Sequence, residues 1–467
     1  MRSARTSPRT SASPRAPITA RFKPLVRVGI LREDERGERR VALVPHSVAQ
    51  LVERGVEVMV ETGAGLASGH TDDAYRDAGA TVSDRSEVGR AEVVVGVRGT
   101  NASHGHDLGP DSGPALAVPA GAVHIALFDP VWNPATATWL AANGVSALSL
   151  ELVPRITRAQ DIDVLSSMAT IAGYEAVLLA ASRLPKLFPL LMTAAGTLAP
   201  ARVLVLGAGV AGLQAIATAR RLGAVVEGYD VRPAAAEQIR SLGARSVEPT
   251  AEAGTDNHRP VSGSDDHDGG EAETAIGVED AGGYATVQST EAEARQRRLL
   301  TPHVAGADVV ITTAAVPGKV SPQLVSREMV EAMQPGSVIV DLAAERGGNT
   351  AVTVADEVVM IGAVTVLGPT DLASRAAHHA SQMFSNNVAR LLDQLLVDDS
   401  PTVNLDPDHD VIGPMLVSHQ GAVVHPQVQA ALETLGTDSG TVVSDSSTNG
   451  NDRNSVDDGR SATERSS

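Results

Sequence analysis

The 467-residue chain contains no cysteine, which excludes disulfide bonds, thiolate zinc sites, iron–sulfur clusters and a cysteine nucleophile. Aromatic residues make up only 2% of it, too few for the stacking surfaces that bind single-stranded nucleic acid. Acidic residues outnumber basic ones by 56 to 38, which gives a net charge of −18. A nucleic-acid-binding protein would instead carry clusters of basic residues. We therefore expect no nucleic-acid partner, and the lack of cysteine fits the cytoplasm.

Long apolar runs are also lacking, since no stretch of 18 or more apolar residues occurs, and we expect no transmembrane helix. Residues 1–22 hold five arginines, no acid and no apolar segment of a secretory signal, so we expect a disordered extension. Residues 248–280 hold ten acids and one arginine, which predicts an acidic surface loop. Residues 436–467 are rich in Ser, Asp and Thr, which predicts a disordered tail.

Between these segments, short apolar runs alternate with helical patterns, which is typical of an α/β fold with parallel sheets. Long helices are expected over 162–184 and 372–396, and a shorter one over 45–54. The expected strands are Val26–Leu31, Val56–Glu61, Glu92–Val97, His124–Leu127, Ser146–Glu151, Val203–Leu206, Val225–Tyr229, Val309–Thr313, Ser337–Leu342, Val364–Leu367, Val411–Leu416 and Ala422–Val424.

A glycine motif follows the strand Val203–Leu206 and precedes a helical pattern, which is the setting that a G-x-G-x-x-G dinucleotide fingerprint requires. Gly207 permits the tight turn, Gly209 lets the backbone approach a pyrophosphate, and Gly212 lets the helix pack close to the strand. The helix N-terminus then offers unpaired N–H groups to the phosphates. The motif therefore predicts a dinucleotide site.

An acidic residue ends the next expected strand. Asp230 lies 23 residues after Gly207, near the offset at which a carboxylate binds the ribose hydroxyls. A carboxylate there repels a 2′-phosphate, so it favours NAD(H) over NADP(H). Arg232, two residues on, weakens this preference because an arginine can hold a 2′-phosphate.

From about Arg27 to Pro426 the chain resembles the NAD(H)-binding soluble alpha subunit (domain I) of proton-translocating NAD(P) transhydrogenase, in the family that also contains alanine dehydrogenase. The stretches that carry the resemblance are Gly29–Glu33, Gly37–Pro45, Pro154–Asp163, Leu165–Met168, Ala172–Tyr174, Ile311–Lys319, Val338–Glu345, Gly347–Asn349 and Gly421–Pro426. The resemblance implies two Rossmann-like, doubly wound parallel-sheet domains joined by long helices. We expect a discontinuous first domain of 23–160 and 355–435, and an NAD-binding second domain of 161–354.

The stretch Pro154–Asp163 looks like the family's loop over the nicotinamide, so the resemblance implies that Arg155, Gln160 and Asp163 hold the nicotinamide and serve catalysis. The alternative is that Asp161 or Asp163 only complements a helix N-terminus. The resemblance further implies nucleotide contacts at the residues Tyr174, Val210, Val231, Gly283, Tyr284, Gln296 and Ala315. Gly283 and Tyr284 would belong to a loop that folds over the nucleotide, and Ala315 would give a backbone contact on the adenosine side.

Alanine dehydrogenase is the alternative within the same fold, and it needs an arginine, a lysine and a proton-transferring histidine around its substrate. Arg40 fits the arginine position, but Arg98 stands at the lysine position. Phe128 stands where the histidine is expected, and His124 is out of register. Direct hydride transfer between two nicotinamides needs no general acid, so these replacements favour the transhydrogenase.

The resemblance implies partners that this chain does not encode. These are a membrane-spanning transhydrogenase subunit and the NADP(H)-binding domain of the beta subunit, with this subunit forming a homodimer at the inner face of the cell membrane. We expect no metal, because the side chains of His378 and His379 diverge on a helix and Asp406–Asp410 lacks the glycine and glutamate of a calcium loop. A hypothesis of another class is a non-catalytic NAD(H)-sensing module.

Overall fold

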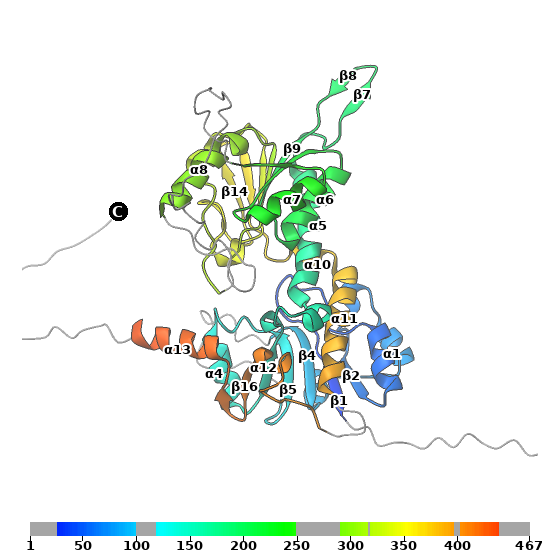
Figure 1. Cartoon of the computed structure of the whole chain (residues 1–467). Helices are drawn as coiled ribbons and strands as arrows, with labels where there is room; N and C mark the ends of the chain where they lie inside the picture. Colours follow the sequence, from blue (N-terminus) through cyan, green and yellow to red (C-terminus); the bar gives the residue numbers. More distant parts are fainter. Residues whose placement is uncertain (1–25, 100–117, 249–289, 316–317, 397–401, 439–467) are drawn as a thin grey trace, which may run out of the picture.

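The computed structural model describes residues 26–99, 118–248, 290–315, 318–396 and 402–438. The predicted extension, nearly all of the predicted acidic loop and the tail beyond 438 lie outside these ranges. Figure 1 shows two lobes, each built around one large sheet, with the helices α5 (Val164–Arg183) and α11 (Ala377–Leu395) at their junction. The expected architecture of two Rossmann-like α/β domains joined by long helices is confirmed.

The first sheet has the order β17-β16-β6-β5-β4-β1-β2-β3, in which the run from β6 to β3 is parallel and β16 is antiparallel to both of its neighbours, β6 and β17. The valines of β4 are buried on both faces, as expected for a central parallel strand. The strands are β1 Arg27–Ile30, β2 Glu57–Glu61, β3 Thr81–Ser83, β4 Val93–Arg98, β5 Val123–Leu127, β6 Ser146–Ser149, β16 Leu416–His419 and β17 Ala422–Val423.

The second sheet has the order β11-β10-β9-β12-β13-β15-β14, parallel except for β14. Since β15 pairs with β13, the second domain includes residues 358–367, and the predicted domain boundary at 355 is wrong. The strands are β9 Arg202–Leu206, β10 Val225–Tyr229, β11 Arg245–Ser246, β12 Val309–Thr312, β13 Val338–Asp341, β14 Val358–Ile361 and β15 Val364–Leu367.

Two element predictions near the C-terminus are also wrong. The helix expected over 372–396 is interrupted at Ala376, so it forms α10 and α11. The segment 411–416, expected as a strand, forms the helix α12 before β16 begins, and it contains Gly413 and Pro414, which both disfavour a strand interior. The predicted tail begins inside α13, which continues to Asp438.

The other helices cover the faces of the two sheets. In the first domain they are α1 Pro45–Glu53, α2 Asp72–Asp77, α3 Arg85–Val88, α4 Pro134–Ala142, α12 Ile412–Met415 and α13 Pro426–Asp438. In the second domain they are α6 Val210–Arg221, α7 Pro233–Ser241, α8 Thr290–Ala305 and α9 Arg327–Glu331, and α10 Leu372–Arg375 precedes α11. Short 3₁₀ helices are η1 Leu66–Ser68, η2 Leu150–Leu152, η3 Thr157–Ile162 and η4 Ala344–Arg346.

Helix α5 belongs to both domains. Its first half, through Ile171, packs in the core of the first domain, and its second half, from Ala176, packs in the core of the second. Between them, a Cβ on Gly173 would overlap the carbonyl oxygen of Ala211, so glycine lets α5 and α6 pack closely. Within the described ranges, α5 alone is long and apolar enough to cross a membrane, whereas the sequence predicts no such helix. Its packing in the cores of the two domains is that of a core helix.

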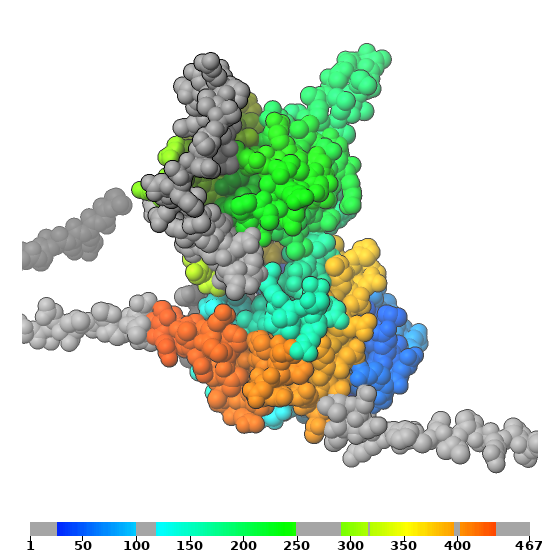
Figure 2. Space-filling view, in the orientation of Figure 1, coloured from blue at the N-terminus to red at the C-terminus, as the bar shows by residue number. Residues whose placement is uncertain are grey.

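A two-stranded hairpin, β7 (Leu191–Thr193) and β8 (Gly196–Leu198), projects from the second domain. Figure 2 shows it extending from the upper lobe. Its apolar side chains are exposed, with Met192 at 74%. Exposed apolar strands of this kind mark a surface suited to another protein chain.

Candidate nucleotide-binding site

A cleft of about 660 Å³ opens at the edge of the second sheet where β9, β10 and β12 end. The strand order reverses between β9 and β12, and this is where doubly wound sheets bind ligands. The predicted residues that line it are Arg155, Gly207, Gly209, Val210, Asp230, Val231, Arg232, Gln296 and Ala315. The fold therefore brings most of the predicted nucleotide contacts within the described ranges to one cleft.

The three glycines of the fingerprint have the geometry that their predicted roles require. Gly207 has a φ of +99°, in the left-handed region that favours glycine. A Cβ on Gly212 would overlap the carbonyl oxygen of Gly207, so close packing of helix and strand needs glycine there. Gly209 precedes α6, and a Cβ on it would meet nothing within 4 Å. Its backbone thus lies open to an approaching phosphate.

Asp230 lies at the end of β10 and faces the glycine turn. Its carboxylate accepts hydrogen bonds from Ala208 N at 2.7 Å and from Arg232 N and Nε at 2.9 and 2.8 Å. Burial alone would raise the pKa of Asp230, but the hydrogen bonds from Arg232 and Ala208 outweigh it and lower the pKa. The carboxylate is therefore charged at neutral pH, and it holds Arg232 beside itself.

The predicted nicotinamide loop lies next to the cleft, but only part of it lines the wall. Arg155 lines the cleft. Gln160 is exposed on η3, and Asp163 caps α5 by accepting hydrogen bonds from Ser166 N at 2.9 Å and Ser166 Oγ at 2.6 Å. Tyr174, on α5, is 42% exposed. Neither Gln160, Asp163 nor Tyr174 lines the cleft, and Gly283 and Tyr284 lie outside the described residues.

The opposite wall is formed by a segment that sequence reasoning did not select, from Val320 to Leu324. Asn349 fixes its position. The Asn349 side chain accepts from Ala314 N at 2.9 Å and donates to the carbonyl oxygens of Ala314 and Pro322 at 2.8 and 2.9 Å. No local pattern could reveal this contact, because 35 residues separate Ala314 from Asn349.

The cleft thus fits a dinucleotide, with an open glycine turn for the phosphates and a charged carboxylate at the ribose position. Comparison with known proteins agrees. Residues 29–172 match the N-terminal domain, and residues 176–426 the C-terminal domain, of the family described as alanine dehydrogenase/PNT. The chain belongs to this family.

Similar proteins place it among the transhydrogenase members of the alanine dehydrogenase/PNT family. It is 39% identical to a Rhodospirillum rubrum chain named as the first portion of NAD(P) transhydrogenase subunit alpha, over 86% of this chain and 98% of the relative. It is 40% identical to the NAD(P) transhydrogenase subunit alpha of Cereibacter sphaeroides, over 86% of this chain and 71% of the relative. The crystal structure of transhydrogenase from Sinorhizobium meliloti matches with a TM-score of 0.69 and 38% identity, over 86% of this chain and 99% of the solved chain.

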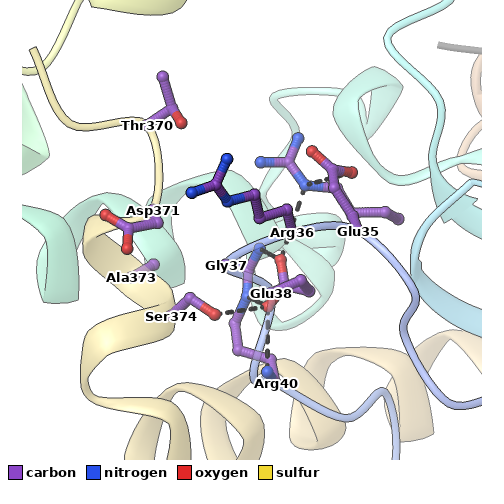
Figure 3. A pocket seen from close by; sticks show the side chains of 10 residues that line it. Glu35, Arg36, Gly37, Glu38, Arg40, Thr370, Asp371, Ala373 and Ser374 are labelled. Atoms are coloured by element: carbon purple, nitrogen blue, oxygen red, sulfur yellow. Dashed lines mark hydrogen bonds and ion pairs between the residues drawn. The ribbon is translucent and has the colours of Figure 1, made fainter. Parts of the chain in front are cut away.

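Family membership implies NAD(H) binding by the second domain and an oxidoreductase role. The family also contains alanine dehydrogenases, which would need a pocket for a small substrate in the first domain. Figure 3 shows a cavity there, between the segment 35–40 and the start of α10. Its volume is about 30 Å³, enough for one or two water molecules.

Of the three arginines that line this cavity, Arg36, Arg40 and Arg98, the one at the predicted substrate position, Arg40, is already paired. Arg40 donates to Glu38 from Nε at 2.7 Å and from Nη2 at 2.5 Å, and the two side chains are 5% and 4% exposed. Burial alone would raise the pKa of Glu38, but the ion pair with Arg40 lowers it to about 2. Glu38 also accepts from the hydroxyl of Ser374 at 2.8 Å. The guanidinium of Arg40 is thus already paired with a carboxylate of the protein.

The histidine of this region is unsuited to proton transfer. His124 is completely buried, and neither ring nitrogen has a hydrogen-bond partner among the described residues. Burial lowers its pKa to about 4, so the ring is neutral at pH 7. Its edge contacts the buried ring of Phe128, with 5.0 Å between centroids. The structure therefore places no proton-transferring histidine at the Phe128 position.

Proposed function

We propose that this chain is the NAD(H)-binding subunit of a proton-translocating NAD(P) transhydrogenase. When bound, NADH supplies a hydride that passes directly to NADP⁺ held by a partner subunit. One contrast carries the proposal: the second domain has an open cleft at the glycine turn, whereas the cavity in the first domain has room for only one or two waters and its Arg40 is already paired with Glu38. An enzyme that passes hydride between two nucleotides needs only the cleft.

The side chains of the cleft have distinct tasks in this proposal. The N–H groups around Gly209 bind the pyrophosphate, and Asp230 accepts hydrogen bonds from the adenosine ribose. Arg155 lines the cleft and holds a phosphate or ribose. We further propose that Gln160 and Asp163, beside Arg155 in the chain, orient the nicotinamide carboxamide. Asp163 would then exchange its bonds to Ser166 for a bond to the nucleotide.

Five further nucleotide contacts stay proposals. Tyr174 is exposed on α5, one residue from the close contact between α5 and α6. Gln296 lines the cleft from α8 and Ala315 lines it after β12. Gly283 and Tyr284 lie outside the described residues, so their contacts rest on the family resemblance alone.

The proposed partners are a membrane-spanning subunit and the NADP(H)-binding domain of a beta subunit, because the relatives in Rhodospirillum rubrum and Cereibacter sphaeroides are named subunit alpha. They would hold this subunit at the cytoplasmic face of the membrane. We also propose a homodimer in which the exposed hairpin formed by β7 and β8 packs on a second copy. Its exposed Met192, Leu191 and Leu198 would be buried there.

Reconstitution tests the activity. The purified chain is mixed with its NADP(H)-binding partner subunit, and the reduction of an NAD analogue by NADPH is followed by absorbance. We expect turnover that requires both proteins, with Gln50→Ala, an exposed glutamine on α1, as the control variant. No turnover, together with pyruvate-dependent NADH oxidation by the chain alone, would identify an alanine dehydrogenase instead.

The sensing hypothesis is tested by Gln160→Ala. If this variant binds NADH normally but loses hydride transfer, the loop serves the reaction and the protein is more than a sensor. Transfer at the wild-type rate in Gln160→Ala would contradict the role proposed for this residue.

A further inference from the structure

Ser321 is the unusual polar residue of the cleft. It is 4% exposed and lines the wall after β12, yet its hydroxyl oxygen has no hydrogen-bond partner among the described residues. Of the buried side-chain nitrogen and oxygen atoms without a partner in the described ranges, only this one belongs to a residue that lines the cleft. An unsatisfied buried hydroxyl is costly, and a ligand in the cleft would satisfy it after a rotation about χ1.

The backbone of Ser321 is attached to the loop after β13. Ser321 N donates to the carbonyl oxygen of Arg346 at 2.9 Å, and a Cβ on the neighbouring Gly347 would touch the side chain of Val320. Ser321 therefore cannot shift far without a shift of η4.

Arg346 in turn reaches the other domain. Its guanidinium forms an ion pair with Asp129 and lies over the Trp132 ring, 4.7 Å from the centroid. Asp129 has a φ of +52°, and its backbone N–H is held by the carboxylate of Glu151 at 2.8 Å. The hydrogen bond to Glu151 holds the backbone at Asp129, so the partner of Arg346 occupies a fixed position.

We propose that Ser321 donates a hydrogen bond to the bound nucleotide, and that Arg346 is a positioning residue that places Ser321 through its ion pair with Asp129. The proposal rests on nucleotide binding in the cleft. It makes the affinity for the nucleotide depend on a contact between the two domains, although Asp129 does not line the cleft.

Titration of the full chain with NADH, followed by nucleotide fluorescence, tests both the contact and the positioning role. We expect Ser321→Ala to raise the Kd for NADH about 5-fold, the effect of one hydrogen bond. Asp129→Asn keeps a residue type that tolerates positive φ but loses the charge, and we expect about a 3-fold rise from the weaker pairing. In the double variant Ser321→Ala/Asp129→Asn, the second substitution should add almost nothing, because Asp129 acts through Ser321.

A matched control and a second probe complete the experiment. Asp73→Asn breaks an exposed ion pair with Arg76 on α2 of the first domain and should leave the Kd within 2-fold. ADP locates the hydrogen bond: weaker ADP binding in Ser321→Ala places it on the adenosine diphosphate half, and unchanged ADP binding places it on the nicotinamide half. An unchanged Kd for NADH in Ser321→Ala overturns the contact, and additive effects in the double variant overturn the positioning role. Failure of the wild-type chain to bind NADH would instead contradict the proposed function.

Discussion

The two sheets have the same order in their six parallel strands, but they differ at the edge where those strands end. In the second domain, the turn after β9 leaves backbone N–H groups facing an open cleft. In the first domain, the corresponding edge is occupied by carboxylates of the protein. Glu33 accepts from Val97 N at 2.6 Å and Arg98 N at 3.1 Å, and Glu151 accepts from Phe128 N at 3.2 Å.

The two edges show that the fold alone does not make a binding site. Both edges present N–H donors that suit an anion. Where carboxyl groups of the chain itself accept these hydrogen bonds, the donors are satisfied and the edge becomes part of the domain core. Where glycines leave the donors uncovered, an anion from outside can bind. Substitutions at the first edge should therefore affect stability, and substitutions at the second edge should affect nucleotide affinity.

The largest effect is expected for Glu38→Gln at the first edge. The variant leaves Arg40 as a buried charge without its carboxylate partner, so we expect a loss of about 3 kcal/mol in the free energy of unfolding. Urea unfolding measures it. Asp73→Asn, which breaks an exposed ion pair with Arg76, is the control and should cost less than about 0.5 kcal/mol.

The same variant also tests whether the first edge influences the affinity for NADH. Glu38→Gln should bind NADH with the wild-type Kd once it is folded. A Kd changed more than 3-fold would show that the two edges are not separate in function.

Gly212→Val, at the second edge, should change the affinity for the nucleotide. The added side chain would overlap the carbonyl oxygen of Gly207 and displace the glycine turn, so we expect the Kd for NADH to rise at least 10-fold. Fluorescence titration measures this change. Binding within 3-fold of the wild type, at unchanged thermal stability, would contradict the role of this turn.

Asp230→Ala tests the choice of nucleotide. The variant loses the acceptor for the ribose and releases Arg232, so the Kd for NADH should rise about 10-fold while NADPH binds more tightly than before. Parallel titrations with the two nucleotides measure the ratio. A ratio that stays at the wild-type value would show that Asp230 does not select against the 2′-phosphate.

The free energy of unfolding should also depend on pH. Burial raises the pKa of Glu33 to about 8, above the value of 4.5 for a free glutamate. The folded state therefore binds more protons than the unfolded state between these pH values, and stability should fall as pH rises from 5 to 8. Glu33→Gln should lose most of this fall, measured by urea unfolding at both pH values. Equal falls in the two proteins would contradict the assignment.

The second-domain site could be predicted largely from sequence because its components are local. Strand, glycine turn, helix and Asp230 follow one another within 28 residues of Val203, and each residue type has one physical role. The Pro154–Asp163 loop is harder to predict. A carboxylate three residues before Ser166 suits both a helix cap and a ligand, and in the structure Asp163 forms the cap.

Long-range pairings could not be predicted. The ion pair of Asp129 with Arg346 joins residues 217 apart, and the predicted domain boundary missed that β15 returns to β13. An apolar run such as 411–416 suits a strand or a buried helix equally well, and neighbouring contacts decide between them.

Helix α5 has a consequence for how the molecule unfolds. One continuous helix supplies Met168 and Ile171 to the first core and Val177 and Ala180 to the second. Loss of either core would expose half of the helix and fray the half that remains. The two domains should therefore melt as one cooperative unit, with calorimetric and van't Hoff enthalpies that agree, although each has its own sheet.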